Sequence, residues 1–147
     1  PGNIMYAHKK IYYVDMANIA HVSKGLRQGL FQLLWHLSNY EYKKAAQALQ
    51  DMAKNKLNEN KYKVFEKRFV KLYDNFKDKT VSQISLTRQM YRTVRLAVDM
   101  GLEYDEGMFP VIKSLMFLDG MVAQVNPDAV LMEDVRPLLK DFNRHMG

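Results

Sequence analysis

Hydrophobic positions recur with two different periods along the chain. Near the start, two short apolar runs at residues 4–6 and 11–14 flank a polar turn at residues 8–10. β-branched and aromatic residues dominate both runs, which is typical of strands, so we predict a β-hairpin. From Ser23 onward, apolar residues recur at three- and four-residue steps, which predicts amphipathic helices. The expected fold is therefore mainly α, with an N-terminal β-hairpin followed by about six helices.

The helices are expected at residues 23–37, 39–56, 61–76, 80–101 (or from 82), 108–125 and 127–142 (or from 128). Ser23 and Asn39 are suitable N-caps for the first two, because their side-chain oxygens can accept from free amides of the first turn. Gly101 should end the fourth helix, and Pro110 is compatible with the first turn of the fifth. Pro137 should kink or divide the last helix, since it lacks an amide hydrogen.

The same periodicity predicts which faces point inward. The first helix carries a leucine face, and Gly25 and Gly29 in that helix permit close packing. The fifth helix is apolar almost all round, so we expect it to be the most buried. The apolar side of the fourth is expected to be formed by Ile84, Leu86, Met90, Tyr91, Val94, Val98 and Leu102.

Length and composition favour one domain, residues 1–147, with a packed core, because 48% of the residues are hydrophobic. There is no cysteine and the four histidines are far apart in the sequence, which argues against disulfides and structural zinc. Lys113 and Asp119 interrupt the most apolar run, so no membrane span is predicted. We expect a cytoplasmic or peripheral membrane protein, and the start at Pro1, without an initiator methionine or a signal-like segment, indicates a piece of a longer one.

The net charge of +6 is concentrated in the middle of the chain, since residues 41–95 carry +8 and the rest −2. Lysines and arginines of the 61–77 helix lie opposite its aromatic stripe. Such a face is usually solvated, but it can also follow an anionic membrane surface or a nucleic-acid backbone. We keep a membrane-surface or interaction module as the alternative function and do not expect nucleic acid to be the partner.

Asn3 and Asp15 stand at the two outer ends of the predicted hairpin. If the arms pair, their side chains return to the same edge of the ribbon. An amide oxygen and a carboxylate are hard ligands that Mg²⁺ accepts beside a phosphate. The alternative is ordinary turn and capping chemistry, for which Asn and Asp are equally suited.

Several segments resemble the UbiB family, the aarF-like atypical kinases linked to ubiquinone biosynthesis. Pro1-Gly2-Asn3-Ile4-Met5 is similar to the end of that family's catalytic loop, His-x-Asp-Pro-His-Pro-Gly-Asn. The segment 10–17 resembles its strand and Asp-Phe-Gly motif, with Met16 and Ala17 in place of Phe and Gly. Residues 23–37, with Arg27, and residues 109–127 resemble later helices, although Asp119 replaces the usual glutamate.

The resemblance implies a kinase-like C-lobe, in which residues 1–17 form the loop tail, hairpin and metal-binding segment and residues 23–146 form the helices. It implies that Asn3 and Asp15 hold Mg-ATP in the full-length protein, as asparagine and aspartate do in kinases. The catalytic base would precede Pro1, and the N-lobe earlier still, so no catalytic residue is assigned in this chain and the chain alone should be inactive. The expected partners are a nucleotide, the N-lobe, an isoprenoid lipid or membrane surface, and a second copy through self-association.

Overall fold

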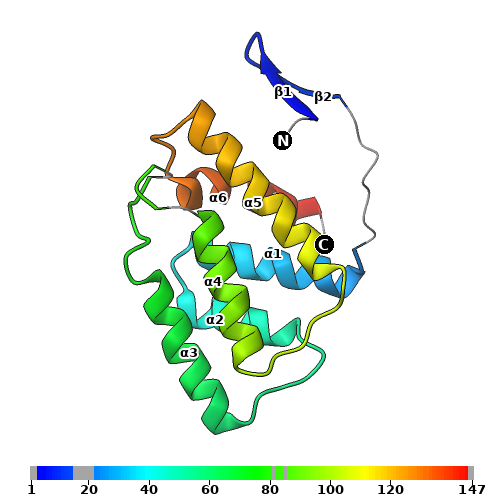
Figure 1. Cartoon of the computed structure of the whole chain (residues 1–147), viewed down its shortest axis with the longest axis vertical. Helices are drawn as coiled ribbons and strands as arrows, with labels where there is room; N and C mark the ends of the chain where they lie inside the picture. The colour runs from blue at the N-terminus through cyan, green and yellow to red at the C-terminus, as the bar shows by residue number, and fades with distance from the viewer. Residues whose placement is uncertain (1–2, 15–21, 81, 85, 146–147) are drawn as a thin grey trace.

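The computed structural model describes residues 3–14, 22–80, 82–84 and 86–145. It contains a two-stranded antiparallel hairpin followed by six helices (Figure 1), which confirms the predicted fold class. Asp15 falls outside the described residues, so its predicted position stays a prediction. The hairpin lies beyond the end of the helical body in Figure 1.

Strands β1 (Ile4–Ala7) and β2 (Lys10–Tyr13) pair with Ile4 opposite Tyr13 and Ala7 opposite Lys10. The connection is a two-residue turn, and His8 and Lys9 both have positive φ angles, 51° and 60°. This is the requirement of a type I′ turn, whose twist matches that of the paired strands. Lys10 therefore belongs to the second strand and not to the turn.

The helices are α1 (Lys24–Ser38), α2 (Tyr42–Asp51), α3 (Glu59–Tyr73), α4 (Leu86–Asp99), α5 (Met108–Val125) and α6 (Leu131–His145). Helix α1 packs on α2 and α6, α3 packs between α2 and α4, and α5 packs on α4. Figure 1 shows α3 and α4 side by side, with α5 crossing the upper half of the body. The core forms where α1 to α4 meet, and residues at the start of α5 and of α6 close it.

Two predicted caps have opposite outcomes. Ser23 caps α1 as expected, since its Oγ accepts from the Leu26 amide at 3.3 Å. Asn39 does not cap the second helix; its Nδ2 donates to the Trp35 carbonyl at 2.8 Å and so completes the end of α1. Tyr40 then takes a left-handed φ of 59°, which delays the start of α2 to Tyr42.

Other boundaries also differ from the prediction. Helix α2 ends at Asp51 because the chain turns toward the Asn58 cap of α3. Helix α4 starts only at Leu86, since the segment before it forms a turn in which the Ile84 amide donates to the Thr80 carbonyl. Helix α6 starts at Leu131 and contains Pro137 without being divided. Gly101 has a φ of 94° just after α4, as expected of a terminating glycine.

The inward face of α4 was predicted only in part: Met90 and Leu102 are buried, and Ile84 and Val94 pack against the core. Tyr91 and Val98 are 57% and 49% exposed, whereas the polar residues Gln89 and Thr93 are buried. The Gln89 amide group donates to the Leu72 carbonyl, and Thr93 bonds within the core, so both satisfy their polar atoms there. The buried face of α4 therefore includes Met90, as predicted, together with two polar residues that the apolar pattern does not mark.

Helix α5 is not the most buried helix. Phe109, Phe117 and Val125 are 52%, 47% and 53% exposed, and among the side chains of α5 that the structure describes only Met108 and Ile112 are buried. By length and composition alone, α5 is the one helix in the described part of the chain that could cross a membrane, a criterion that core helices of soluble proteins also meet. The main packing partner of α5 is α4, and these three apolar side chains are not covered by it.

Two side chains fix the ends of helices to distant segments. In α6, Arg136 donates from Nε to the Ser38 carbonyl at 2.9 Å, and its guanidinium lies 5.6 Å from the Tyr40 ring. After α2, Asn55 donates to the Gly101 carbonyl at 2.7 Å and accepts from the Glu103 amide at 3.0 Å. These contacts join α6 to α1, and the loop after α2 to the loop after α4.

Candidate functional site

The predicted metal site lies at the open end of the hairpin. The Val14 amide donates to the Asn3 carbonyl at 2.8 Å, one position beyond the last strand pair. Asn3 is exposed, with its side chain at the end of the ribbon. The structure thus places Asn3 beside Val14, while the approach of Asp15 to Asn3 lies outside the described residues. Within the described ranges, no group of three or more His, Asp or Glu side chains is placed to hold a metal ion.

The hairpin carries apolar side chains that are open to solvent on both faces. Met5, Tyr6, Ile11 and Tyr13 are 55%, 53%, 61% and 69% exposed. An isolated two-stranded hairpin is only marginally stable in water, because it has too little surface to bury. Contiguous exposed apolar residues of this kind are typical of surfaces that contact another molecule or another part of the same protein.

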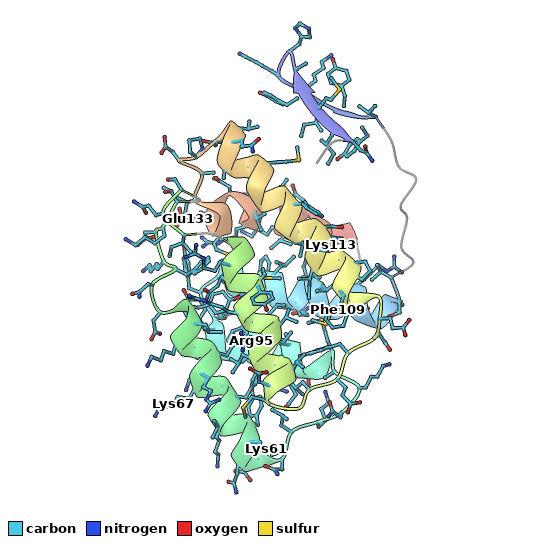
Figure 2. All side chains as sticks on the ribbon, viewed as in Figure 1. Lys61, Lys67, Arg95, Phe109, Lys113 and Glu133 are labelled. Atoms are coloured by element: carbon cyan, nitrogen blue, oxygen red, sulfur yellow. The ribbon has the colours of Figure 1, made fainter. Side chains whose placement is uncertain are left out.

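The basic face of α3 is arranged as the sequence indicated. Phe65, Phe69 and Tyr73 are fully buried, whereas the cations of the opposite side are exposed. Figure 2 shows Lys61 and Lys67 pointing away from the helical body. We call the exposed cations of α3 and α4 the basic face; they are Lys61, Lys63, Lys67, Arg68, Lys71, Arg88, Arg92 and Arg95.

Acidic neighbours offset part of this charge. Lys63 pairs with Glu59 at 2.6 Å, and Arg95 lies 3.7 Å from Asp99. Both pairs are one helical turn apart and solvent-exposed, so they contribute little to stability. The basic face retains a positive excess that can attract anions over the range of the Debye length.

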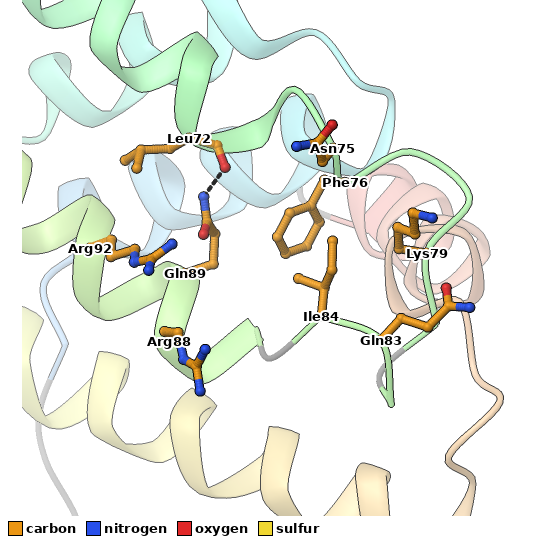
Figure 3. A pocket seen from close by; sticks show the side chains of 9 residues that line it. All are labelled: Leu72, Asn75, Phe76, Lys79, Gln83, Ile84, Arg88, Gln89 and Arg92. Atoms are coloured by element: carbon orange, nitrogen blue, oxygen red, sulfur yellow. Dashed lines mark hydrogen bonds between the residues drawn. The ribbon is translucent and has the colours of Figure 1, made fainter.

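A cavity of about 550 Å³ opens between the end of α3 and the start of α4. Its lining combines three kinds of side chain: the apolar Leu72, Phe76 and Ile84, the amides Asn75, Gln83 and Gln89, and the cations Lys79, Arg88 and Arg92. Figure 3 shows the two arginines on the α4 side, and Lys79 with Gln83 on the opposite side. The volume of the cavity lies in the range of small-molecule sites, and its lining is more polar than is usual for them.

A hydroxyl pair connects α3 and α4 beneath this cavity. Tyr73 Oη lies 2.8 Å from Thr93 Oγ1, and Thr93 Oγ1 donates to the Gln89 carbonyl at 2.9 Å. Because the threonine proton is used in that second bond, Tyr73 is the donor of the first. Burial raises the pKa of Tyr73 to about 12. Tyr73 is thus a structural hydrogen-bond donor that keeps its proton at neutral pH.

Comparisons with known proteins give limited information. No family model matches the chain, and no solved structure matches it significantly. The chain is similar to a Clostridium pasteurianum protein described as an uncharacterized protein in the hydrogenase 1 5′ region, with 18% identity over 146 residues. The match includes 99% of this chain but only 27% of that relative, so the chain spans about a quarter of the relative's length.

Sequence reasoning located the hairpin and the basic face but missed the cavity. Its lining comes from the end of α3, the following turn and the start of α4, so no continuous motif marks it. One signal was available, because Arg88 and Arg92 are four residues apart and therefore share one helix face. The amides and Phe76 join them only through the turn between α3 and α4.

Proposed function

We propose that the chain is the helical C-lobe of an atypical kinase or ATPase that resembles the UbiB family. In the longer protein, Asn3 and Asp15 would hold Mg-ATP, and the activity would serve ubiquinone or other isoprenoid-lipid metabolism. The observation that carries the proposal is the Val14–Asn3 backbone bond of 2.8 Å. This bond pairs Asn3 with Val14, and Asp15 is the next residue in the sequence.

The chemistry of the two side chains suits this role. The Asn3 amide oxygen and the Asp15 carboxylate are the oxygen ligands that Mg²⁺ takes when it also binds phosphate groups. In phosphoryl transfer, the metal neutralises charge on the phosphates, while other groups position the nucleophile. By resemblance those other groups, the catalytic base and the phosphate-binding lysine, belong to segments before Pro1. Our proposal therefore assigns metal and nucleotide binding, and no catalytic base, to this chain.

The test uses the longer native protein and a non-hydrolysable ATP analogue with Mg²⁺. We expect Asp15→Ala and Asn3→Ala each to weaken Mg²⁺-dependent nucleotide binding by at least about tenfold, as loss of groups around a metal typically does. Asp128→Ala is the matched control, because it removes an exposed carboxylate from the turn before α6. Unchanged nucleotide affinity and activity in Asp15→Ala would refute the assignment.

A second function is supported by the basic face, which could hold the chain on an anionic membrane surface. Its cations project from two neighbouring helices, α3 and α4, on the outside of the body. Binding to vesicles that contain phosphatidylserine should weaken as salt is raised and should weaken further in Lys67→Gln/Lys71→Gln. Lys140→Gln in α6 is the control. If vesicle binding changes neither with salt concentration nor in the double variant, a membrane-surface function of the basic face is excluded.

A further inference from the structure

The cavity between α3 and α4 is separate from the hairpin and has its own chemistry. Of its nine lining residues, three are cationic and none is acidic. Arg88 and Arg92 are one helical turn apart, so they raise the positive potential on the same side of the cavity.

The carboxylates closest to the cavity residues in the sequence do not line the cavity. Asp74 and Asp78 lie in the same stretch as the turn between α3 and α4, yet neither lines the cavity. Their charges act instead on the hydroxyl of Tyr42, whose pKa is raised to about 12, mainly by burial and then by Tyr40 and these two carboxylates. The cations therefore face the cavity, and the acids act on the tyrosines of the α1–α2 connection.

The bottom of the cavity is apolar and rigidly held. Phe76 is 8% exposed and contacts the Tyr73 ring at a centroid distance of 5.3 Å. Gln89 is 5% exposed, and its amide group donates to the Leu72 carbonyl, which fixes α4 against the end of α3. Figure 3 shows Phe76 and Ile84 between the arginines and Lys79. An entering ligand thus meets an aromatic ring and an aliphatic side chain between two groups of cations.

We propose that this cavity binds a small organic phosphate. Its phosphate would lie against Arg92 on the α4 side, with an aromatic or aliphatic part against Phe76 and Ile84, which lie between Arg92 and Lys79. A guanidinium binds phosphate through two parallel hydrogen bonds, whereas ammonium acts as a point charge. The volume of about 550 Å³ suits a ligand with both parts.

The test measures binding of phenyl phosphate, inorganic phosphate and phenol to the full chain by NMR titration. Phenyl phosphate carries both parts of the proposed ligand, so it should bind about tenfold more tightly than either single-part compound. The side-chain amide signals of Asn75, Gln83 and Gln89 should shift, since all three line the cavity. Equal affinity for phenyl phosphate and phenol would overturn the proposal.

Substitutions separate the cavity from the general charge of the basic face. Arg92→Gln should weaken phenyl phosphate binding by about tenfold through loss of a charge-assisted contact. Arg95→Gln is the matched control, because Arg95 lies on the same helix, outside the cavity lining, and is 3.7 Å from Asp99. Circular dichroism melting confirms that each variant is folded. An equal effect of Arg92→Gln and Arg95→Gln would show diffuse attraction only and would overturn the proposal.

A phosphate ester can come from solution or from a lipid headgroup, and phosphatidic acid vesicles distinguish the two. Vesicle binding that requires Arg92, and that phenyl phosphate displaces, supports a headgroup as the natural ligand. If the chain binds phenyl phosphate but shows no vesicle binding that depends on Arg92, the natural ligand is a soluble phosphate ester. If the chain binds neither phenyl phosphate nor the vesicles, the proposed site is refuted.

Discussion

Replacing Thr93 by valine is expected to destabilise the helical body through Tyr73. Both residues are essentially inaccessible to solvent, at 1% and 0% exposure. Valine has nearly the same shape as threonine, so the change opens no cavity, but it leaves the Tyr73 hydroxyl buried without its acceptor. An unmade hydrogen bond of this kind costs about 1–3 kcal/mol. In a domain of this length, each kcal/mol lowers the melting temperature by about 2–4 °C.

A double-mutant cycle isolates the contact. Tyr73→Phe removes the donor, and once it is gone Thr93→Val should cost much less, because no buried hydroxyl is then left unpaired. We expect the two substitutions to be non-additive by about 1 kcal/mol in the free energy of unfolding, measured by urea denaturation.

Tyr42→Phe provides the control for the cycle. The Tyr42 hydroxyl is buried without a hydrogen-bond partner among the described residues, and its ring stacks on Tyr73 at 5.7 Å. Phenylalanine keeps the stacking and removes the desolvated hydroxyl, so stability should be unchanged or raised. Additivity of Tyr73→Phe and Thr93→Val within about 0.5 kcal/mol, or an equal loss in Tyr42→Phe, would refute this account of the α3–α4 contact.

Three further predictions follow from other contacts. Gly29→Ala should lower the melting temperature, because an added Cβ would lie 2.0 Å from Met52 Cγ. Gly25→Ala is the control, because a Cβ there meets nothing within 4 Å, and it should raise stability by about 0.5–1 kcal/mol. The same change in melting temperature for both variants would contradict the close contact between Gly29 and Met52. Arg136→Ala should cost about 1–3 kcal/mol by leaving a buried carbonyl unpaired, and Arg136→Lys should not restore the loss, as urea denaturation would show. The pKa of Tyr73 is raised from 10 to about 12 in the folded protein, so the unfolded chain loses this proton at a lower pH than the folded one. The stability linked to this proton is complete below pH 10 and is lost as the pH rises toward 12. Urea midpoints measured from pH 9 to 12 should therefore fall less steeply in Tyr73→Phe.

Apolar periodicity predicted the order and approximate ranges of all the elements. It identified the inward stripe of α3 correctly, because Phe65 and Phe69 are both apolar and correctly spaced. On α4 it identified Met90 correctly but missed Gln89 and Thr93, which are buried through hydrogen bonds that depend on α3. It also failed on α5, since an apolar helix does not reveal whether protein or solvent surrounds it.

The candidate sites show the same division between local and long-range information. The hairpin could be predicted because strand propensity and a polar turn are local properties of the first residues. The cavity could not, because its shape depends on how the end of α3 meets α4. Asn39 is intermediate: its residue type indicates a cap, but the left-handed Tyr40 decides which helix it caps.

The exposed hairpin has a consequence for hydrogen exchange. In a two-stranded ribbon each strand is an edge strand, so part of its amides face solvent and exchange quickly. The amides that bond across the ribbon, including Val14 at its open end, are protected only while the two strands are paired. Amides in α3 exchange only when the aromatic core opens. Protection at Val14 would therefore rise when another protein segment or a ligand settles on the hairpin, which makes this single amide a sensitive reporter of docking.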